Sequence, residues 1–329
     1  MSYTEELDVA IEAVKKASLL CSQVQANLVA AASMDKQDKS PVTVADFSAQ
    51  ALVTHILGSA FPDIPLVGEE DADALREPEN QALAQQVVSH VTGAVSAIEA
   101  GDVLDLIDSG THGGGASGRH WTLDPIDGTK GFLRMDQYAV ALALIEDGEV
   151  VLGVLGCPNL PRESAAPDGE RGCLFAAAKG QGAFQRGLAG GAETGIHVTD
   201  IREAAQANFC ESVEAGHSSQ SDSARVAERL GITADPFRID SQCKYGAVSR
   251  GDASIYLRLP TRKDYQEKIW DHAAGSIVVR EAGGQVSDVL GRELDFSQGR
   301  TLAKNTGVIV TNGALHAPVL AAVREVLGV

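Results

Sequence analysis

Apolar residues recur every three or four positions in three stretches of the first hundred residues, a spacing that predicts amphipathic helices. The predicted helices cover residues 4–32, 44–61 and 79–100. Pro41 precedes the second stretch and Pro62 follows it, and proline is typical of helix boundaries. A short apolar run over residues 64–67 predicts a buried strand that ends just before Glu69.

Short apolar runs between turn signals continue through the middle of the chain and predict strands. Residues 138–146 and 149–156 are two such runs, separated by Asp147 and Gly148. An Asp-Gly pair between apolar runs favours a hairpin, because the tight turn needs positive φ at its central positions. Further strands are predicted over residues 174–178 and 196–198. Irregular structure is predicted over the glycine-rich residues 101–119 and the proline-rich residues 158–171.

Helical and strand-like runs alternate after about residue 200. The predicted strands cover residues 208–213, 255–259 and 308–310, and the predicted helices cover residues 224–230 and 270–283. This change of pattern predicts a mixed α/β protein with two domains, residues 1–200 and 201–329. A chain of 329 residues is long enough for two domains of ordinary size.

The charge is strongly acidic and unevenly distributed. Twenty-seven basic and 45 acidic residues give a formal net charge of −18. A phosphate polymer would be repelled, so we expect no nucleic-acid polymer as a partner. Residues 238–304 carry 11 basic and 9 acidic side chains, a net of +2. This region is suited to a small anion, whereas the carboxylates elsewhere are suited to divalent cations.

Membrane and secreted classes are not expected. The apolar runs are far shorter than the ~20 residues that cross a bilayer, and the acidic N-terminus does not resemble a signal peptide. The five cysteines are odd in number and lack a Cys-x-x-Cys pair, which favours a reducing compartment. We therefore expect a soluble, intracellular protein located in the cytoplasm. If a transit peptide has been removed, a plastid or a mitochondrion is the alternative location.

Several carboxylates stand at the ends of apolar runs instead of on polar faces. They are Asp46, Glu69, Asp124, Asp127 and Asp271. A lone carboxylate in such a place is usually a helix cap or a solvated strand end. The sequence Asp-Pro-Ile-Asp-Gly-Thr at residues 124–129 is more specific, because its proline restricts the backbone between two carboxylates. Several carboxylates and a carbonyl are the oxygen ligands that Mg²⁺ prefers beside a phosphate.

Three segments together resemble signature motifs of the inositol monophosphatase superfamily, which are Mg²⁺-dependent and Li⁺-sensitive phosphomonoesterases. They are Gly-Glu-Glu at 68–70, the 124–129 sequence, and Trp-Asp-His-Ala-Ala-Gly at 270–275. Residues 39–46 and 128–133 resemble one branch, the plant-type 3′(2′),5′-bisphosphate nucleotidases. The resemblance covers nearly the whole chain and implies a layered α-β-α-β-α sandwich, with a metal-binding N-terminal domain and a C-terminal domain that contributes nucleotide-binding residues.

The resemblance implies a role for each motif residue. Asp46 and Thr129 would orient and deprotonate the attacking water. Two or three Mg²⁺ ions, with inhibition by Li⁺, are implied, held by Glu69, Asp124, the Ile126 carbonyl, Asp127 and Asp271. The choice of Glu69 over Glu70 rests on the resemblance alone. The implied substrate contacts are Gly128, Thr129, His217, Ser241, Lys244, Arg258 and Asp271.

The implied reaction is removal of the 3′-phosphate of adenosine 3′,5′-bisphosphate, giving AMP and phosphate. The sulfated nucleotide, 3′-phosphoadenosine 5′-phosphosulfate, is a further candidate substrate. Two alternatives stay open: an inositol polyphosphate 1-phosphatase, and a nucleotide-binding sensor without catalysis. The expected partner is therefore a small nucleotide, and the sequence is compatible with a monomer or a homodimer.

Overall fold

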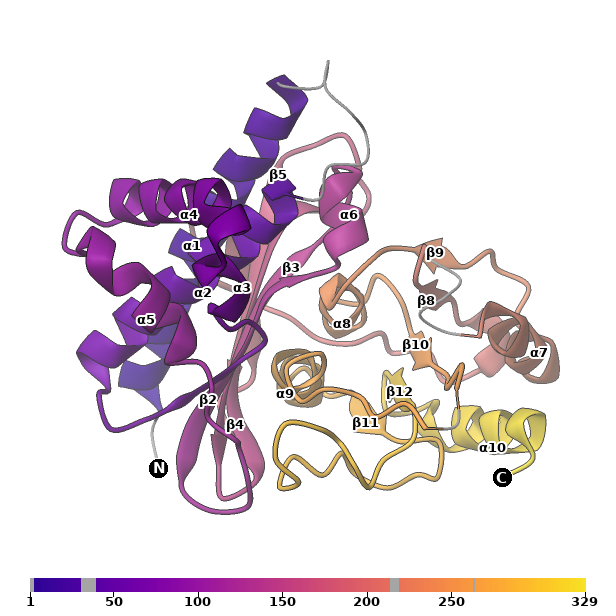
Figure 1. Ribbon diagram of the computed structural model, residues 1–329. Coiled ribbons are helices and arrows are strands. Elements are labelled where there is room, and N and C mark those ends of the chain that lie inside the picture. Colours follow the sequence, from indigo (N-terminus) through magenta and orange to yellow (C-terminus); the bar gives the residue numbers. More distant parts are fainter. Residues whose placement is uncertain (1–2, 31–39, 214–218, 263) are drawn as a thin grey trace.

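A computed structural model describes residues 3–30, 40–213, 219–262 and 264–329 (Figure 1). Its α-helices are α1 (Thr4–Ala30), α2 (Ser40–Ala60), α3 (Asp73–Arg76), α4 (Gln81–Ala94), α5 (Val103–Asp108), α6 (Thr129–Leu133), α7 (Gln220–Leu230), α8 (Cys243–Ser249), α9 (Ala273–Glu281) and α10 (His316–Leu327). Short 3-10 helices are η1 (Pro78–Asn80), η2 (Ala100–Asp102) and η3 (Ala204–Gln206).

The strands form two sheets in the described part of the chain. The first sheet runs in sequence order through β1 (Leu66–Gly68), β2 (Arg119–Asp127), β3 (Ala139–Glu146), β4 (Glu149–Pro161), β5 (Arg171–Ala178), β6 (Ala183–Gly187) and β7 (Thr194–Gly195). The second has the order β11 (Gln285–Ser287), β12 (Val308–Thr311), β10 (Ile255–Arg258), β8 (Phe209–Glu211) and β9 (Phe237–Arg238).

The helices cover the two sheets in alternating layers (Figure 1). Helices α1 and α2 pack on one face of the first sheet, while α8 and α9 lie between the sheets. Helix α10 packs against β12 on the outer side of the second sheet, beside α7. The order of layers is therefore α-β-α-β-α, which confirms the predicted sandwich.

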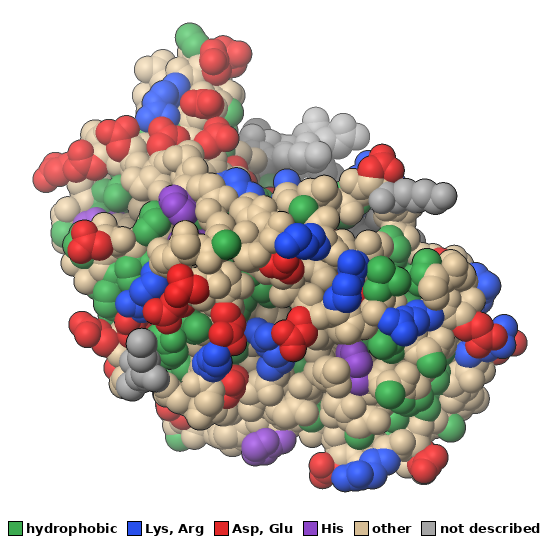
Figure 2. Space-filling view, turned by 90° about the horizontal axis from the view of Figure 1, so that it is seen from below, with side chains coloured by type: hydrophobic (Ala, Val, Ile, Leu, Met, Phe, Trp, Pro, Cys, Tyr) green, Lys and Arg blue, Asp and Glu red, His purple; other side chains and the backbone are tan. Residues whose placement is uncertain are grey.

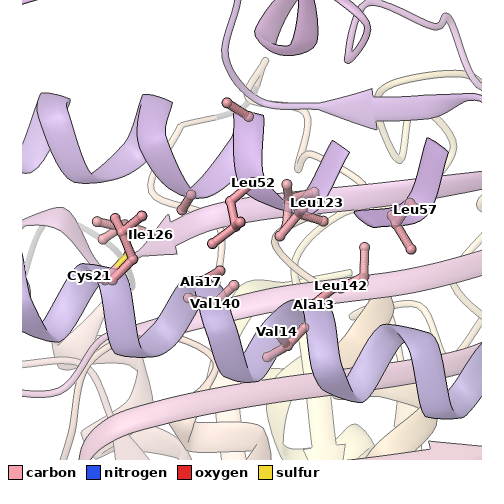
Figure 3. Close-up of a cluster of buried hydrophobic side chains, with 14 of the residues drawn as sticks. Ala13, Val14, Ala17, Cys21, Leu52, Leu57, Leu123, Ile126, Val140 and Leu142 are labelled. Carbon is pink, nitrogen blue, oxygen red and sulfur yellow. The ribbon is translucent and has the colours of Figure 1, made fainter. Parts of the chain in front are cut away.

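Buried apolar side chains fill each interface between layers. Figure 3 shows part of the first cluster, in which Ala17 and Cys21 of α1 meet Leu52 of α2 and Val140 and Leu142 of β3. The stripe that predicts the first helix is thus the face of α1 that packs on the sheet. Since α9 packs against β4 of the first sheet, the division near residue 200 stays a prediction about folding units.

The predicted hairpin is present between β3 and β4. Asp147 and Gly148 have φ values of 51° and 79°, the positive values that its tight turn requires. Strand β4 then continues to Pro161, beyond the predicted end at residue 156. It continues because Cys157 still pairs with Cys173 of β5 and Pro161 with Arg171, although prolines interrupt the apolar run.

Other predicted boundaries are wrong. The third helix ends at Ala94 instead of residue 100, because Val95 has an extended backbone. Residues 101–119, predicted to be irregular, contain α5, whose Val103 and Ile107 are buried. The strand predicted over residues 196–198 is instead β7, two residues earlier and paired with β6. The helix predicted from Trp270 begins at Ala273.

No helix in the described ranges has both the length and the apolar composition needed to cross a membrane.

Candidate active site

Two parallel strands bring the first carboxylates of the site together. Strands β1 and β2 pair with Gly68 opposite Leu123, so Glu69 leaves β1 beside Asp124. The pairing of β2 with β3 then shifts register between Asp124 and Asp127. These two residues are three apart along β2, yet they face Ala141 and Ala139, which are only two apart along β3.

This bulge decides where the two aspartates point. Residues three apart on a regular strand point to opposite faces. The extra residue of a bulge restores the alternation, so Asp124 and Asp127 emerge on the same side of the sheet. Pro125 lies inside the bulge, where its missing N–H costs no regular ladder bond. The Asp-Pro-Ile-Asp spacing therefore places both carboxylates at one site.

All the predicted metal ligands line one cavity of about 510 Å³, together with Gly128, Thr129 and Arg258. The ligand candidates there are Glu69, Asp124, Ile126, Asp127 and Asp271. Glu70, the alternative to Glu69, does not line this cavity. Four acidic residues and Ile126 thus line a common space that is large enough for a substrate.

Asp271 lies in a turn before α9, and a buried glutamine fixes that turn. The Gln242 Nε2 donates to the Trp270 carbonyl at 2.8 Å, and its Oε1 accepts from the Gly275 N–H at 3.0 Å. The Gln242 backbone N–H donates to Asp127 Oδ2 at 2.6 Å. One residue therefore holds both Asp127 and the chain around Asp271.

A second buried glutamine fixes the glutamates after β1. Gln50 lies one turn after Asp46 on α2, and its Nε2 donates to the Glu70 carbonyl at 2.6 Å. Its Oε1 accepts from the Glu70 N–H at 3.1 Å. A Cβ at Gly68 would lie only 2.5 Å from Gln50 Oε1, which explains the glycine there. These two hydrogen bonds hold the Glu70 backbone against α2, and the next residue back, Glu69, lines the cavity.

Burial and mutual repulsion disfavour the charged forms of these carboxylates. Burial and the neighbouring Asp271 and Glu70 raise the pKa of Glu69 to about 8. Burial and Glu69 raise the pKa of Asp124 well above its usual value. Burial and Asp271 raise the pKa of Asp127 to about 6, opposed by nearby cationic side chains. The site therefore holds protons until a cation compensates the charge.

The residues present fit Mg²⁺. Asp124 Oδ1 is buried and has no hydrogen-bond partner in the described structure, so it is an acceptor without a donor. The surrounding donor set consists of carboxylate and carbonyl oxygens, as hard divalent cations prefer. A second acidic group, Glu267 with Asp271 and His272, is less suitable, because Glu267 already binds Arg258 at 2.8 Å and His272 at 3.1 Å.

The predicted substrate residues meet beside the carboxylates. A small adjoining cavity of about 20 Å³ is lined by Gly128, Ser241, Lys244 and Arg258, together with Asp127, Asp271 and others. Burial lowers the pKa of Lys244, whose ammonium lies 5.2 Å from the centre of the Tyr256 ring. Ser241 has a φ of 64°, an uncommon conformation for a serine that is typical of functional sites.

Arg258 connects the cationic side to the acidic side. Its Nη2 lies 3.3 Å from Asp271 Oδ2, and its Nε lies 2.8 Å from Glu267 Oε2. Glu267 is 3.1 Å from His272 Nε2, whose other ring nitrogen is 2.7 Å from the Tyr245 hydroxyl. This buried chain of hydrogen bonds gives the Arg258 guanidinium a fixed orientation toward the cavity.

Two predicted catalytic groups approach from different elements. Asp46 lies on α2 and Thr129 begins α6, and these two helices are in contact. Burial, together with Glu70 and Glu69, raises the pKa of Asp46 well above its usual value. The described structure shows no hydrogen bond between Asp46 and Thr129, so their joint action stays a prediction. His217 lies outside the described residues.

Four residues that hold the ligand candidates were not predicted from the sequence: Gln50, Gln242, Glu267 and Tyr245. Gln50 carried a signal, since it is a polar residue on an otherwise apolar stretch of helix, four positions after Asp46. The roles of the others depend on partners that only the tertiary structure brings near.

Comparison with known proteins gives this arrangement a family. The profile of the inositol monophosphatase family matches residues 2–327. A protein of Emericella nidulans named 3′(2′),5′-bisphosphate nucleotidase is 48% identical, with 99% of both chains covered. A protein of Schizosaccharomyces pombe with the same name is 46% identical, and one of Arabidopsis thaliana, named 3′(2′),5′-bisphosphate nucleotidase 1, is 47% identical. Each alignment covers 99% of this chain and 97% of the relative.

Solved structures share the fold. The inositol monophosphatase of Anabaena aligns with a TM-score of 0.64 at 20% identity, covering 99% of this chain and 97% of that chain. The IMPase of Thermotoga maritima aligns with a TM-score of 0.63 at 22% identity, covering 98% of both chains. By the extent of the profile match and the similarity of its full-length relatives, this chain belongs to the inositol monophosphatase family.

Proposed function

We propose that this protein is a Mg²⁺-dependent phosphomonoesterase that converts adenosine 3′,5′-bisphosphate to AMP and phosphate. The observation that carries the proposal is one site with two chemically different sides. Glu69 and Asp124 line only the larger cavity and Lys244 lines only the smaller cavity beside it, while Asp127, Asp271 and Arg258 line both. The relatives named bisphosphate nucleotidases, similar along their full length, support the same substrate class.

A bisphosphate needs both sides of this site. The phosphate to be cleaved lies at the carboxylates, where Glu69, Asp124, the Ile126 carbonyl, Asp127 and Asp271 hold the Mg²⁺ ions. When bound, Mg²⁺ supplies positive charge for the phosphate oxygens and acidifies the attacking water. The phosphate that is not cleaved lies against Lys244 and Arg258. Arginine offers a planar fork of donors and lysine a point charge, and both suit a phosphate.

The protons balance through Asp46 and solvent. Water oxygen bonds to phosphorus, the bond from phosphorus to the ribose 3′-oxygen breaks, and that oxygen takes a proton from solvent water, which the proton later released by Asp46 replaces. Thr129 orients the water and passes its proton toward Asp46. Because burial raises its pKa, the Asp46 carboxylate is a stronger base than an exposed aspartate. Gly128, Ser241 and His217 complete the nucleotide contacts in this proposal.

The deciding experiment measures phosphate release from adenosine 3′,5′-bisphosphate by the purified protein. Activity is expected with Mg²⁺, loss of activity with EDTA, and inhibition when Li⁺ is added. The sulfated nucleotide and an inositol 1,4-bisphosphate are compared at equal concentration. Faster turnover of the inositol bisphosphate would assign the protein to the alternative substrate class. Nucleotide binding without any phosphate release would indicate the non-catalytic sensor.

A further inference from the structure

Arg300 lies outside the three sequence motifs, in the chain between β11 and β12, yet it contacts the residue before a metal-ligand candidate. Its Nη2 donates to the Gly68 carbonyl at 2.6 Å, and its Nη1 donates to the His112 carbonyl at 3.2 Å. Gly68 is the last residue of β1, directly before Glu69. The Gly68 N–H is also bound, to the Gly110 carbonyl at 2.7 Å.

The same side chain contacts the residue before a second ligand candidate. The Arg300 guanidinium lies 4.8 Å from the centre of the Trp270 ring, which is a cation–π distance. The Arg300 carbonyl accepts from the Ile269 N–H at 3.2 Å, and Lys268 pairs with Thr301. The backbone and the side chain of Arg300 therefore both hold the segment that leads into Asp271.

Arg300 therefore contacts two segments that are distant in the sequence. Gly68 and Trp270 are about two hundred residues apart in sequence, and each directly precedes a carboxylate of the cavity. Arg300 itself is not among the residues that line that cavity. The planar guanidinium of arginine offers several donors at its edge and a flat face. It can therefore bind the Gly68 and His112 carbonyls and also lie against the Trp270 ring.

We propose that Arg300 is a positioning residue that sets the separation of Glu69 and Asp271 and thereby the affinity for Mg²⁺. The proposal rests on the metal-dependent function proposed above. Without the guanidinium, the segment after β1 loses its link to the Trp270 segment. Mg²⁺ binding must then draw the two carboxylates together, so the affinity falls, whereas a high Mg²⁺ concentration restores most of the turnover.

The test compares the wild-type protein with Arg300→Met, Arg300→Lys and a control, Arg292→Met. Arg292 lies in the same region, but it pairs with Asp288 and its side chain is half-exposed. Mg²⁺ affinity is measured by calorimetric titration without substrate, and activity is measured over a range of Mg²⁺ concentrations. Residues that support ligands typically contribute about 10–100-fold to metal affinity, and Arg300→Met should lose at least tenfold.

The companion measurements separate positioning from folding. The Mg²⁺ concentration for half-maximal activity should rise in parallel with the dissociation constant, with kcat at saturating Mg²⁺ within a few-fold of the wild type. Arg300→Lys keeps the positive charge but loses the planar guanidinium, so it should bind Mg²⁺ at least threefold more weakly than the wild type. Full recovery by lysine, or an Arg300→Met affinity within twofold of the control, would overturn the proposal. Calorimetry reports on Arg300 even if the wild type proves inactive on the nucleotide, so the two proposals fail separately.

Discussion

Asp124 is the residue on which the cation site depends most. It is almost fully buried, and its Oδ1 has no hydrogen-bond partner among the described residues. An unpaired carboxylate oxygen at such a depth is costly unless a proton or a cation occupies it. We therefore expect Asp124 to lower the stability of the metal-free protein and to contribute to the proposed affinity for Mg²⁺.

Replacing Asp124 with asparagine should separate these two effects. Asp124→Asn keeps the size of the side chain but removes its charge, so we expect activity to fall by orders of magnitude. Its melting temperature in EDTA should equal or exceed that of the wild type, because repulsion with Glu69 is relieved. Asp105→Asn is the control, since that side chain is 83% exposed. Near-normal turnover of Asp124→Asn at saturating Mg²⁺ would exclude Asp124 as a ligand.

Arg258 allows a test of substrate selectivity. Arg258→Ala should raise KM for adenosine 3′,5′-bisphosphate much more than for 3′-AMP, which lacks the 5′-phosphate. A charged hydrogen bond to phosphate contributes roughly 1.5–3 kcal/mol, or about tenfold or more in affinity. Steady-state kinetics on both substrates give the comparison. Equal losses would mean that Arg258 acts through its contacts with Glu267 and Asp271 and not through the 5′-phosphate.

Asp46 and Thr129 can be tested as a pair. Thr129→Val and Asp46→Asn each preserve shape and should each lower kcat strongly, with little effect on nucleotide binding. If both residues act on the same proton, the double variant should be scarcely slower than either single variant. The measurement is kcat for all four proteins at saturating Mg²⁺. Losses that add in log kcat would show two independent roles.

At the scale of elements, the site depends on the close approach of α9 to β4. A Cβ at Gly153 would lie 2.5 Å from Ile277 Cγ2 and 2.7 Å from the Ala274 carbonyl oxygen. No side chain therefore separates this strand from the helix in that place. Since Asp271 lies directly before α9, the depth at which the helix packs also sets the position of a ligand.

Gly153→Ala should force α9 away from the sheet. Overpacking of this kind typically costs about 1–3 kcal/mol in the free energy of unfolding. Mg²⁺ affinity should fall as well, because Asp271 moves with the helix. The control is Gly93→Ala in the last turn of α4, where a Cβ meets nothing within 4 Å and stability should be unchanged or higher. Urea unfolding of both variants supplies the comparison, and equal stabilities would contradict direct packing.

Helices and strands with a regular spacing of apolar residues were predictable from the sequence, whereas the residues at which they end were not. The long helices and the hairpin follow from local sequence, because one buried face or one turn fixes each of them. The end of β4 and the start of α9 depend on distant partners, Cys173 and Gln242 respectively. The carboxylates of the site were likewise recognisable as motifs. The bulge that points Asp124 and Asp127 to one side, and the glutamines that hold them, required the paired strands.

At the scale of the whole molecule, acidic residues exceed basic residues by 18. On the face in Figure 2, lysine and arginine side chains lie among aspartates and glutamates instead of forming one continuous basic patch. Inside the site, burial and the neighbouring carboxylates raise the pKa of Glu69 to about 8. The stability of the metal-free protein therefore depends on pH through this group.

The direction of that dependence follows from proton linkage. An unfolded Glu69 ionises near its usual pKa, while the folded residue keeps its proton up to about pH 8. The metal-free protein should therefore lose stability as the pH rises from about 6.5 to 8. Unfolded His120 has its pKa near 6.5, at the lower end of this range, and burial lowers its folded pKa to about 4, so its opposing effect on stability ends as the pH rises. Melting temperatures in EDTA test the prediction.

Two comparisons assign this pH effect to the site. Saturating Mg²⁺ should abolish or reverse the loss of stability between pH 6.5 and 8, because the cation replaces the proton on Glu69. Glu69→Gln should weaken the dependence in EDTA, since the amide does not titrate. A metal-free protein whose melting temperature rises over this pH range would show that other groups dominate.

The position of Asp271 at the head of α9 also has a consequence for the order of folding. Glu69, Asp124 and Asp127 lie on or next to the paired strands β1 and β2, whereas the position of Asp271 depends on the packing of α9 against the first sheet. The complete set thus assembles across a long separation in sequence, which is a slow and late event. A cation that binds only the completed set cannot guide the earlier steps. We therefore expect bound Mg²⁺ to slow the first separation of α9 from the sheet far more than it speeds folding.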